Sequence, residues 1–145
     1  MSAQRNLPRS IAAVVAGFLA GAILSLGTDA ILHETGVFPG WGKPMSDGLF
    51  GLATAYRLVF NILGCYITAR LAPRSPMYHA LAVGIIGLLL SILGAVTTWN
   101  RGPEFGPHWY PLLLIVTCLP CAWLGGKLRE RQLASSAARS AMTAD

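Results

Sequence analysis

Two residues of opposite charge, Asp29 and Arg57, lie inside long apolar stretches of the chain. An ionised group in the hydrocarbon of a bilayer costs about 2.5 to 3.5 kcal/mol on insertion scales, so such groups normally pair or line a wet cavity. An arginine side chain can extend toward the membrane surface, so the two residues can meet on adjacent helices. They therefore predict either an ion pair that fixes helix packing or a pocket that binds a small polar or anionic molecule.

Further polar residues accompany Arg57 at helical spacing. Thr54, Arg57 and Asn61 recur at three- and four-residue steps, and the polar stripe continues along the same stretch. Residues at these steps share one face of a helix, which predicts that this face points into a helical bundle. We therefore take Asp29, Thr54, Arg57 and Asn61 as the candidate lining of a ligand pocket that opens on the outer side.

Cys118 and Cys121 form a C-x-P-C motif, which resembles a thiol–disulfide exchange site. The arrangement is similar to that of four-helix membrane oxidoreductases that pass electrons from thiols to quinone, and the resemblance implies a redox role for both cysteines. Two departures favour a structural role instead. Both sulfurs fall near the middle of an apolar run, where burial suppresses the reactive thiolate, and no outer loop carries a cysteine to relay the disulfide. Pro120 predicts a bend in this helix.

No other motif indicates catalysis. The sequence has no phosphate-binding glycine pattern, no Gly-x-Ser-x-Gly motif and no paired histidines at metal-binding spacing. The acidic and imidazole groups of the outer loops do not share a helix face, as metal ligands on one helix would. We therefore expect no metal and no cofactor, and no enzyme activity apart from the thiol alternative.

Four apolar stretches must position these side chains, near residues 11–32, 49–70, 77–99 and 109–126. Charged residues make up only 12% of the 145 residues, against about 25% in a soluble domain. Each stretch is close to the ~20 residues that cross a bilayer as a helix, and none alternates like a β-barrel strand. The first stretch exceeds the about 7–15 residues of a cleavable signal core, so we expect it to be retained. The sequence predicts an all-α, integral membrane four-helix bundle.

The basic residues are unevenly distributed along the chain. Eight of the eleven lysines and arginines precede the first stretch, separate the second from the third or follow the fourth. By the positive-inside rule, both termini are cytoplasmic. The net charge of +5 is then explained by basic residues on the cytoplasmic side of the membrane and does not indicate nucleic-acid binding. The lipid bilayer is the predicted partner. We expect one transmembrane domain over residues 1–132, a mobile cytoplasmic tail over 133–145 and, by default, a bacterial inner membrane.

Small residues recur at four-residue steps in the first and third stretches. Gly17 and Gly21 form a G-x-x-x-G pattern, and a similar pattern begins at Gly84. Small residues let helix backbones approach closely in lipid, so the Gly17/Gly21 face predicts tight packing and is a candidate contact for a homo-oligomer. A spacing of 67 residues relates Gly17 to Gly84 and Phe38 to Phe105. It suggests two repeated helical hairpins of the same orientation, an arrangement known among transporters.

These patterns predict a small multi-pass membrane protein without enzyme activity. It would act as an accessory subunit or by binding a small ligand or lipid on its outer side. Two alternatives stay open: a quinone-linked thiol–disulfide oxidoreductase that uses Cys118 and Cys121, and a small-solute transporter or subunit of an oligomeric channel. A pore inside a single chain is not expected, because four helices rich in small residues pack too closely.

Overall fold

The computed structural model describes residues 2–143, with side chains from residue 6 onward. Within this range the chain forms four α-helices and one short 3-10 helix, and no strand. The elements are α1 (Ser2–Glu34), α2 (Asp47–Leu71), α3 (Pro76–Thr98), η1 (Pro103–Phe105) and α4 (Trp109–Met142). All four α-helices are long and apolar enough to cross a membrane. The all-α, four-helix prediction is therefore confirmed.

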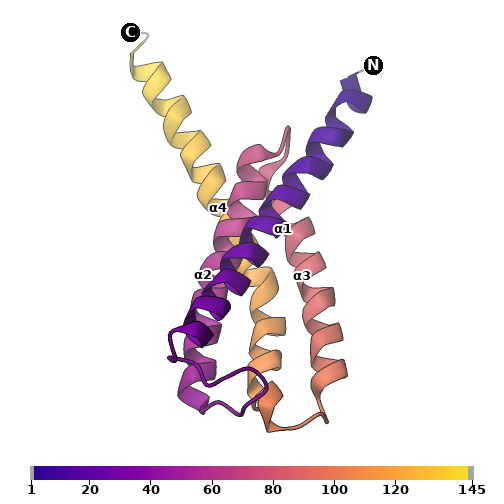
Figure 1. Cartoon of the computed structure of the whole chain (residues 1–145). Coiled ribbons are helices and arrows are strands. Elements are labelled where there is room, and N and C mark those ends of the chain that lie inside the picture. Colours follow the sequence, from indigo (N-terminus) through magenta and orange to yellow (C-terminus); the bar gives the residue numbers. More distant parts are fainter. Residues whose placement is uncertain (1, 144–145) are drawn as a thin grey trace.

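The α-helices run alternately in opposite directions (Figure 1). The start of α1, the turn between α2 and α3 and the end of α4 lie at one end of the molecule, which we call the terminal end. The connections 35–46 and 99–108 lie at the other end, the loop end. α1 packs along α2 and α3 along α4, the two hairpins meet mainly through α2 and α4, and α1 touches α3 only lightly.

The centre of the bundle consists of small side chains. Its fully buried cluster contains Cys65, Ala69, Ala80, Val83 and Ala122. The long aliphatic side chains lie instead on the outer surface of the helices, as Leu19, Leu89 and Val116 illustrate. In lipid, helices associate through close backbone packing rather than by hiding large apolar groups, so this distribution suits a bilayer environment.

Three glycines bring α1 and α2 into direct backbone contact. A Cβ atom added to Gly64 would lie 2.6 Å from the carbonyl oxygen of Gly17 and 3.5 Å from the Cα of Gly21. The face of α1 that was predicted as an oligomer contact is thus covered by α2 within one chain. A homo-oligomer stays a prediction, and it has to use a different surface.

The outer two helices extend well beyond the predicted stretches. α1 begins at Ser2 rather than near residue 11, and α4 ends at Met142 rather than near residue 126. Residues 133–142, predicted as a mobile tail, continue α4 as regular helix, while their mobility stays a prediction. Charged residues mark the end of an apolar stretch, but they do not end the helix. The residues that follow the apolar part of α4 include Ala, Arg, Gln and Leu, which are all strong helix formers.

Each connection at the loop end is held by a histidine. His33 Nδ1 lies 2.6 Å from the carbonyl oxygen of Pro39, and its ring stacks on Trp41 with centroids 3.8 Å apart. His108 Nε2 lies 3.1 Å from the carbonyl oxygen of Trp99, and its ring stacks on that indole at 4.3 Å. Both imidazoles therefore serve the folding of their own loops.

Candidate functional site

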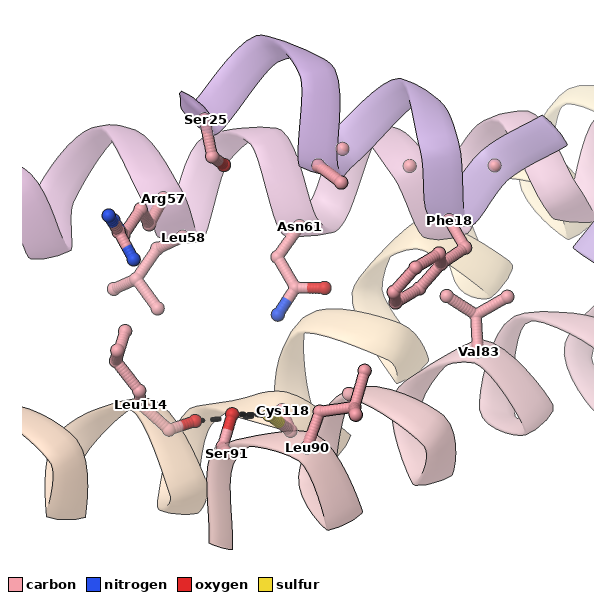
Figure 2. Close-up of a pocket in the computed structure, with 15 residues that line it drawn as sticks. Phe18, Ser25, Arg57, Leu58, Asn61, Val83, Leu90, Ser91, Leu114 and Cys118 are labelled. Carbon is pink, nitrogen blue, oxygen red and sulfur yellow. Dashed lines mark hydrogen bonds between the residues drawn. The ribbon is translucent and has the colours of Figure 1, made fainter. Parts of the chain in front are cut away.

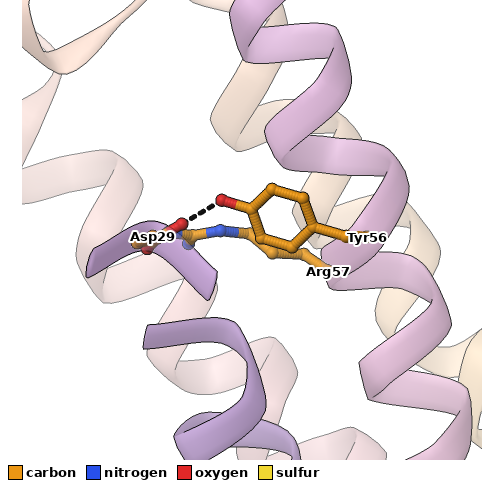
Figure 3. Close-up of polar contacts among 3 residues, drawn as sticks. All are labelled: Asp29, Tyr56 and Arg57. Carbon is orange, nitrogen blue, oxygen red and sulfur yellow. Dashed lines mark hydrogen bonds and ion pairs between the residues drawn. The ribbon is translucent and has the colours of Figure 1, made fainter. Parts of the chain in front are cut away.

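Asp29 is the buried acceptor of two hydrogen bonds from α2. Asp29 lies near the loop end of α1 and is only 8% exposed. The Tyr56 hydroxyl donates to Oδ1, and Arg57 Nη2 donates to Oδ2 and completes an ion pair (Figure 3). The pairing of Asp29 with Arg57 that the sequence allowed is therefore present, and Tyr56 is an additional donor.

The glycine contact sets the register of this pair. Asp29 follows Gly21 by eight residues, and Arg57 precedes Gly64 by seven. At 1.5 Å per residue these separations are about 12 Å and about 10.5 Å, so antiparallel helices in contact at the glycines carry both side chains to the same level. The ion pair lies two turns from the backbone contact, on the side of the loop end.

A cavity of about 250 Å³ opens between the helices beside this pair. All four α-helices contribute to its wall (Figure 2). Its polar lining consists of Ser25, Arg57, Asn61, Ser91 and Cys118. Asn61 points from α2 toward α3 and α4 on the opposite side, while Ser25 faces the same space from α1 (Figure 2). The cavity thus gathers hydrogen-bonding groups within an otherwise apolar wall.

These polar groups are weakly satisfied by the protein. Among the described residues, the hydrogen-bond partner of Asn61 Oδ1 is the Cys65 thiol at 3.9 Å, and that of Ser91 Oγ is the Cys118 thiol at 3.6 Å. Arg57 Nε is buried and has no hydrogen-bond partner among the described residues. Thiols are weak hydrogen-bonding groups, so the lining retains capacity for a polar molecule.

A second cavity of about 370 Å³ adjoins the first and continues toward the loop end. The two share Arg57, Leu90, Ser91 and Leu114 in their walls. The second cavity adds Thr98 of α3, Phe105 of η1, and Tyr110 and Pro111 of α4. On the side of the terminal end, the small-residue cluster around Cys65 and Ala122 fills the bundle. The combined space therefore has Arg57 at its junction and extends toward the loop end.

Two of the predicted pocket residues, Asp29 and Thr54, line neither cavity. Asp29 pairs with the lining residue Arg57, whereas Thr54 bonds within its own helix. The Thr54 hydroxyl donates to the carbonyl oxygen of Phe50 at 2.9 Å, and the residue is buried outside the lining of both cavities. Threonine commonly bonds the carbonyl one turn back in a helix, which satisfies its hydroxyl locally. Of the four candidates, Asp29 and Arg57 form the pair, and Asn61 shares the cavity with Arg57.

The two cysteines of the C-x-P-C motif occupy different surroundings. Both are buried free thiols. Cys118 lines the cavity and donates to the carbonyl oxygen of Leu114 at 3.1 Å, whereas Cys121 is not part of the lining. A redox role for Cys118 and Cys121 stays a prediction.

Sequence reasoning missed three polar groups of this region. Ser25 lies four residues after Gly21 and Ser91 seven after Gly84, so both continue the small-residue patterns that predict helix packing. Tyr56 does not lie on the polar stripe of Arg57. A hydroxyl inside an otherwise apolar stretch is the signal that could have found them, because it needs a partner in lipid.

No family model, curated protein or solved structure matches the chain.

Proposed function

We propose that this chain is a multi-pass protein of a bacterial inner membrane and that it binds the polar end of a small amphiphile in the cavity at Arg57. The four apolar helices and their exposed aliphatic side chains support four membrane spans. The terminal end carries Arg70, Arg74 and the basic residues of α4, whereas the loop end carries Lys43 and Arg101. This asymmetry favours a cytoplasmic terminal end and an outward-facing cavity.

The observation that carries the proposal is a set of three polar side chains, Ser25, Asn61 and Ser91, which line one cavity from three helices. Their donors and acceptors remain available to a ligand. Polar groups without partners are costly in hydrocarbon, so the cavity needs water or a polar ligand. Asp29 balances the charge of Arg57, which makes a neutral or zwitterionic group a better occupant than a bare anion. This refines the sequence-based expectation of an anion at an unpaired arginine.

An apolar tail on the ligand is supported by the rest of the cavity wall. Phe18 of α1 and Leu90 of α3 border the cavity, and Leu90 is 49% exposed. Because α1 touches α3 only lightly, the space between them offers an entry from the membrane. A lipid-like molecule could place its polar end at Asn61 and its tail between α1 and α3.

Native mass spectrometry of the protein extracted in mild detergent tests this proposal. We expect a retained adduct whose mass and fragmentation identify a small amphiphile. Asn61→Leu should abolish the adduct, because it removes the amide that faces the cavity. Thr117→Val is the matched control, since the Thr117 hydroxyl bonds the Leu113 carbonyl and lies outside both cavities. Absence of any adduct, or its equal retention in both variants, would contradict the proposal.

A small-solute transporter is the second candidate, because the two cavities form a space that extends from mid-bundle toward the loop end. Transport would also require opening of the cluster around Cys65 and Ala122. In a chain with all three cysteines replaced by alanine, Ser91→Cys reports on access to the cavity. Labelling by an impermeant maleimide from both membrane faces would favour transport, and labelling from the outer face alone would favour binding. The accessory-subunit role stays a prediction.

A further inference from the structure

The helical extension of α4 forms a basic groove with the end of α2. The groove has a volume of about 540 Å³ and lies at the terminal end, where Arg70 follows Arg57 by 13 residues, about 20 Å along α2. Its wall includes four arginines and two serines: Arg70 from α2, and Arg129, Arg131, Ser135, Ser136 and Arg139 from α4. The groove exists because α4 continues as helix beyond its apolar stretch.

No carboxylate lines this groove. Glu130, the acidic residue within α4 (Trp109–Met142), pairs with Lys127 at 3.2 Å and is not part of the lining. None of the four arginines forms an ion pair with a described residue. Four like charges around one groove repel each other, so an anion bound among them would relieve that repulsion.

The walls of the groove are joined by side-chain hydrogen bonds. The Tyr66 hydroxyl of α2 donates to Gln132 Oε1 of α4 at 2.8 Å, and Arg70 Nη1 donates to the same hydroxyl at 3.4 Å. These bonds join α2 to α4 beside the groove and hold Arg70, and the buried Arg129 Nε is a donor without an acceptor among the described residues.

The position of the groove distinguishes a lipid from a soluble ligand. Trp123 lies one turn before Lys127, and Tyr78 lies in the first turn of α3, and both are exposed. Exposed Trp and Tyr at the ends of apolar helices are typical of the membrane–water interface. Arg129 and Arg131 lie about 9 to 12 Å beyond Trp123 along α4, at the level where lipid phosphates lie. Arg139 lies about 12 Å further along the same helix.

We propose that this groove binds the phosphate of an anionic phospholipid in the leaflet at the terminal end. Guanidinium groups pair with phosphate oxygens in a bidentate geometry, which suits arginine better than lysine. All four cations of the groove are arginines. The site is separate from the cavity at Arg57, so neither assignment depends on the other.

Native mass spectrometry in detergent, with phosphatidylglycerol or phosphatidylcholine added, tests the site. We expect phosphatidylglycerol to bind about tenfold more tightly than phosphatidylcholine, and the double variant Arg129→Gln/Arg139→Gln to lose this preference. The matched control is Arg9→Gln/Arg74→Gln, which removes the same charge at the terminal end outside the groove and should keep the preference. The exposed single variant Arg139→Gln should lower the preference without affecting the fold.

Three results would overturn the assignment. Equal affinity for the two lipids would show that the groove does not select an anionic phospholipid. Equal loss of the preference in both double variants would show that the general surface charge, not the groove, attracts the lipid. Displacement of phosphatidylglycerol by inorganic phosphate would show that the groove takes soluble phosphate rather than a lipid. Asn61→Leu should leave phosphatidylglycerol binding unchanged, which separates this test from that of the cavity.

Discussion

In both helical hairpins a glycine lets the two helices approach closely, but the group that faces the glycine differs. In the α1–α2 hairpin, backbone lies against backbone, because a Cβ on Gly64 would lie 2.6 Å from the Gly17 carbonyl oxygen. In the α3–α4 hairpin, backbone lies against a side chain, because a Cβ on Gly84 would lie 2.5 Å from the Cβ of Ala122. The contact of Gly64 with the Gly17 carbonyl has no side chain that can be trimmed, whereas the contact of Gly84 with Ala122 has one.

The hairpins also differ in how polar groups fix them. The ion pair of Asp29 with Arg57 joins α1 to α2, whereas α3 and α4 share the weak contact between Ser91 and Cys118. A charged pair fixes the register of the first hairpin, whereas the second hairpin depends mainly on the close fit of its helices. Gly17 and Gly84 are equivalent positions of the predicted repeat, and each makes a close contact in its own hairpin. The repeat itself stays a prediction.

The largest effect is expected from Gly64→Leu. A leucine has no space between the backbones of α1 and α2, so we expect the free energy of unfolding in mixed detergent micelles to fall by about 3 kcal/mol or more. Gly51→Leu is the matched control on the same helix, because a Cβ there meets nothing within 4 Å. Equal stability of the two variants would show that the α1–α2 contact is not close.

The ion pair should have the next largest effect. Asp29→Leu leaves Arg57 without its carboxylate, and we expect a loss of about 2 kcal/mol, below the figure for a fully buried pair because Arg57 is partly exposed. The double variant Asp29→Leu/Arg57→Leu should recover part of this loss, since no unpaired charge remains. The same unfolding measurement checks both, and a double variant less stable than Asp29→Leu would contradict the pairing argument.

The smallest effect should come from the second hairpin. Gly84→Ala introduces a methyl group against Ala122, and we expect a loss of about 1 to 2 kcal/mol. Gly84→Ala/Ala122→Gly exchanges the two sides and should restore most of the stability. Gly94→Ala is the control, because a Cβ at that position meets nothing within 4 Å. If the double variant is no more stable than Gly84→Ala, the contact between Gly84 and the Ala122 side chain does not explain the loss. The contrast with the α1–α2 hairpin would then be wrong.

The sequence alone was sufficient to predict the four helices and one contact between them. Long apolar stretches predicted four helices, and two charges inside such stretches predicted the meeting of Asp29 with Arg57, because lipid allows few other arrangements. The cavity could not be predicted, since it depends on which helix faces meet. Ser91 became part of it only because α3 turns that hydroxyl toward α2 and α4.

Two other differences have local causes. Thr54 shares the polar stripe of Arg57, yet its short hydroxyl reaches the Phe50 carbonyl before it can reach a neighbouring helix. The extension of α4 was missed because apolar composition marks a membrane span and says little about where a helix ends. Helix propensity over residues 127–142, which are rich in Ala and Arg, would have predicted it.

The buried carboxylate of Asp29 has a consequence for biosynthesis. A ribosome completes α1 before it makes α2, and the arginine that pairs with Asp29 is separated from it by 28 residues. A lone α1 released into lipid would expose an ionised group without a counter-ion. We therefore expect the first two helices to leave the translocon together, as a preassembled unit, with the remaining two added afterwards.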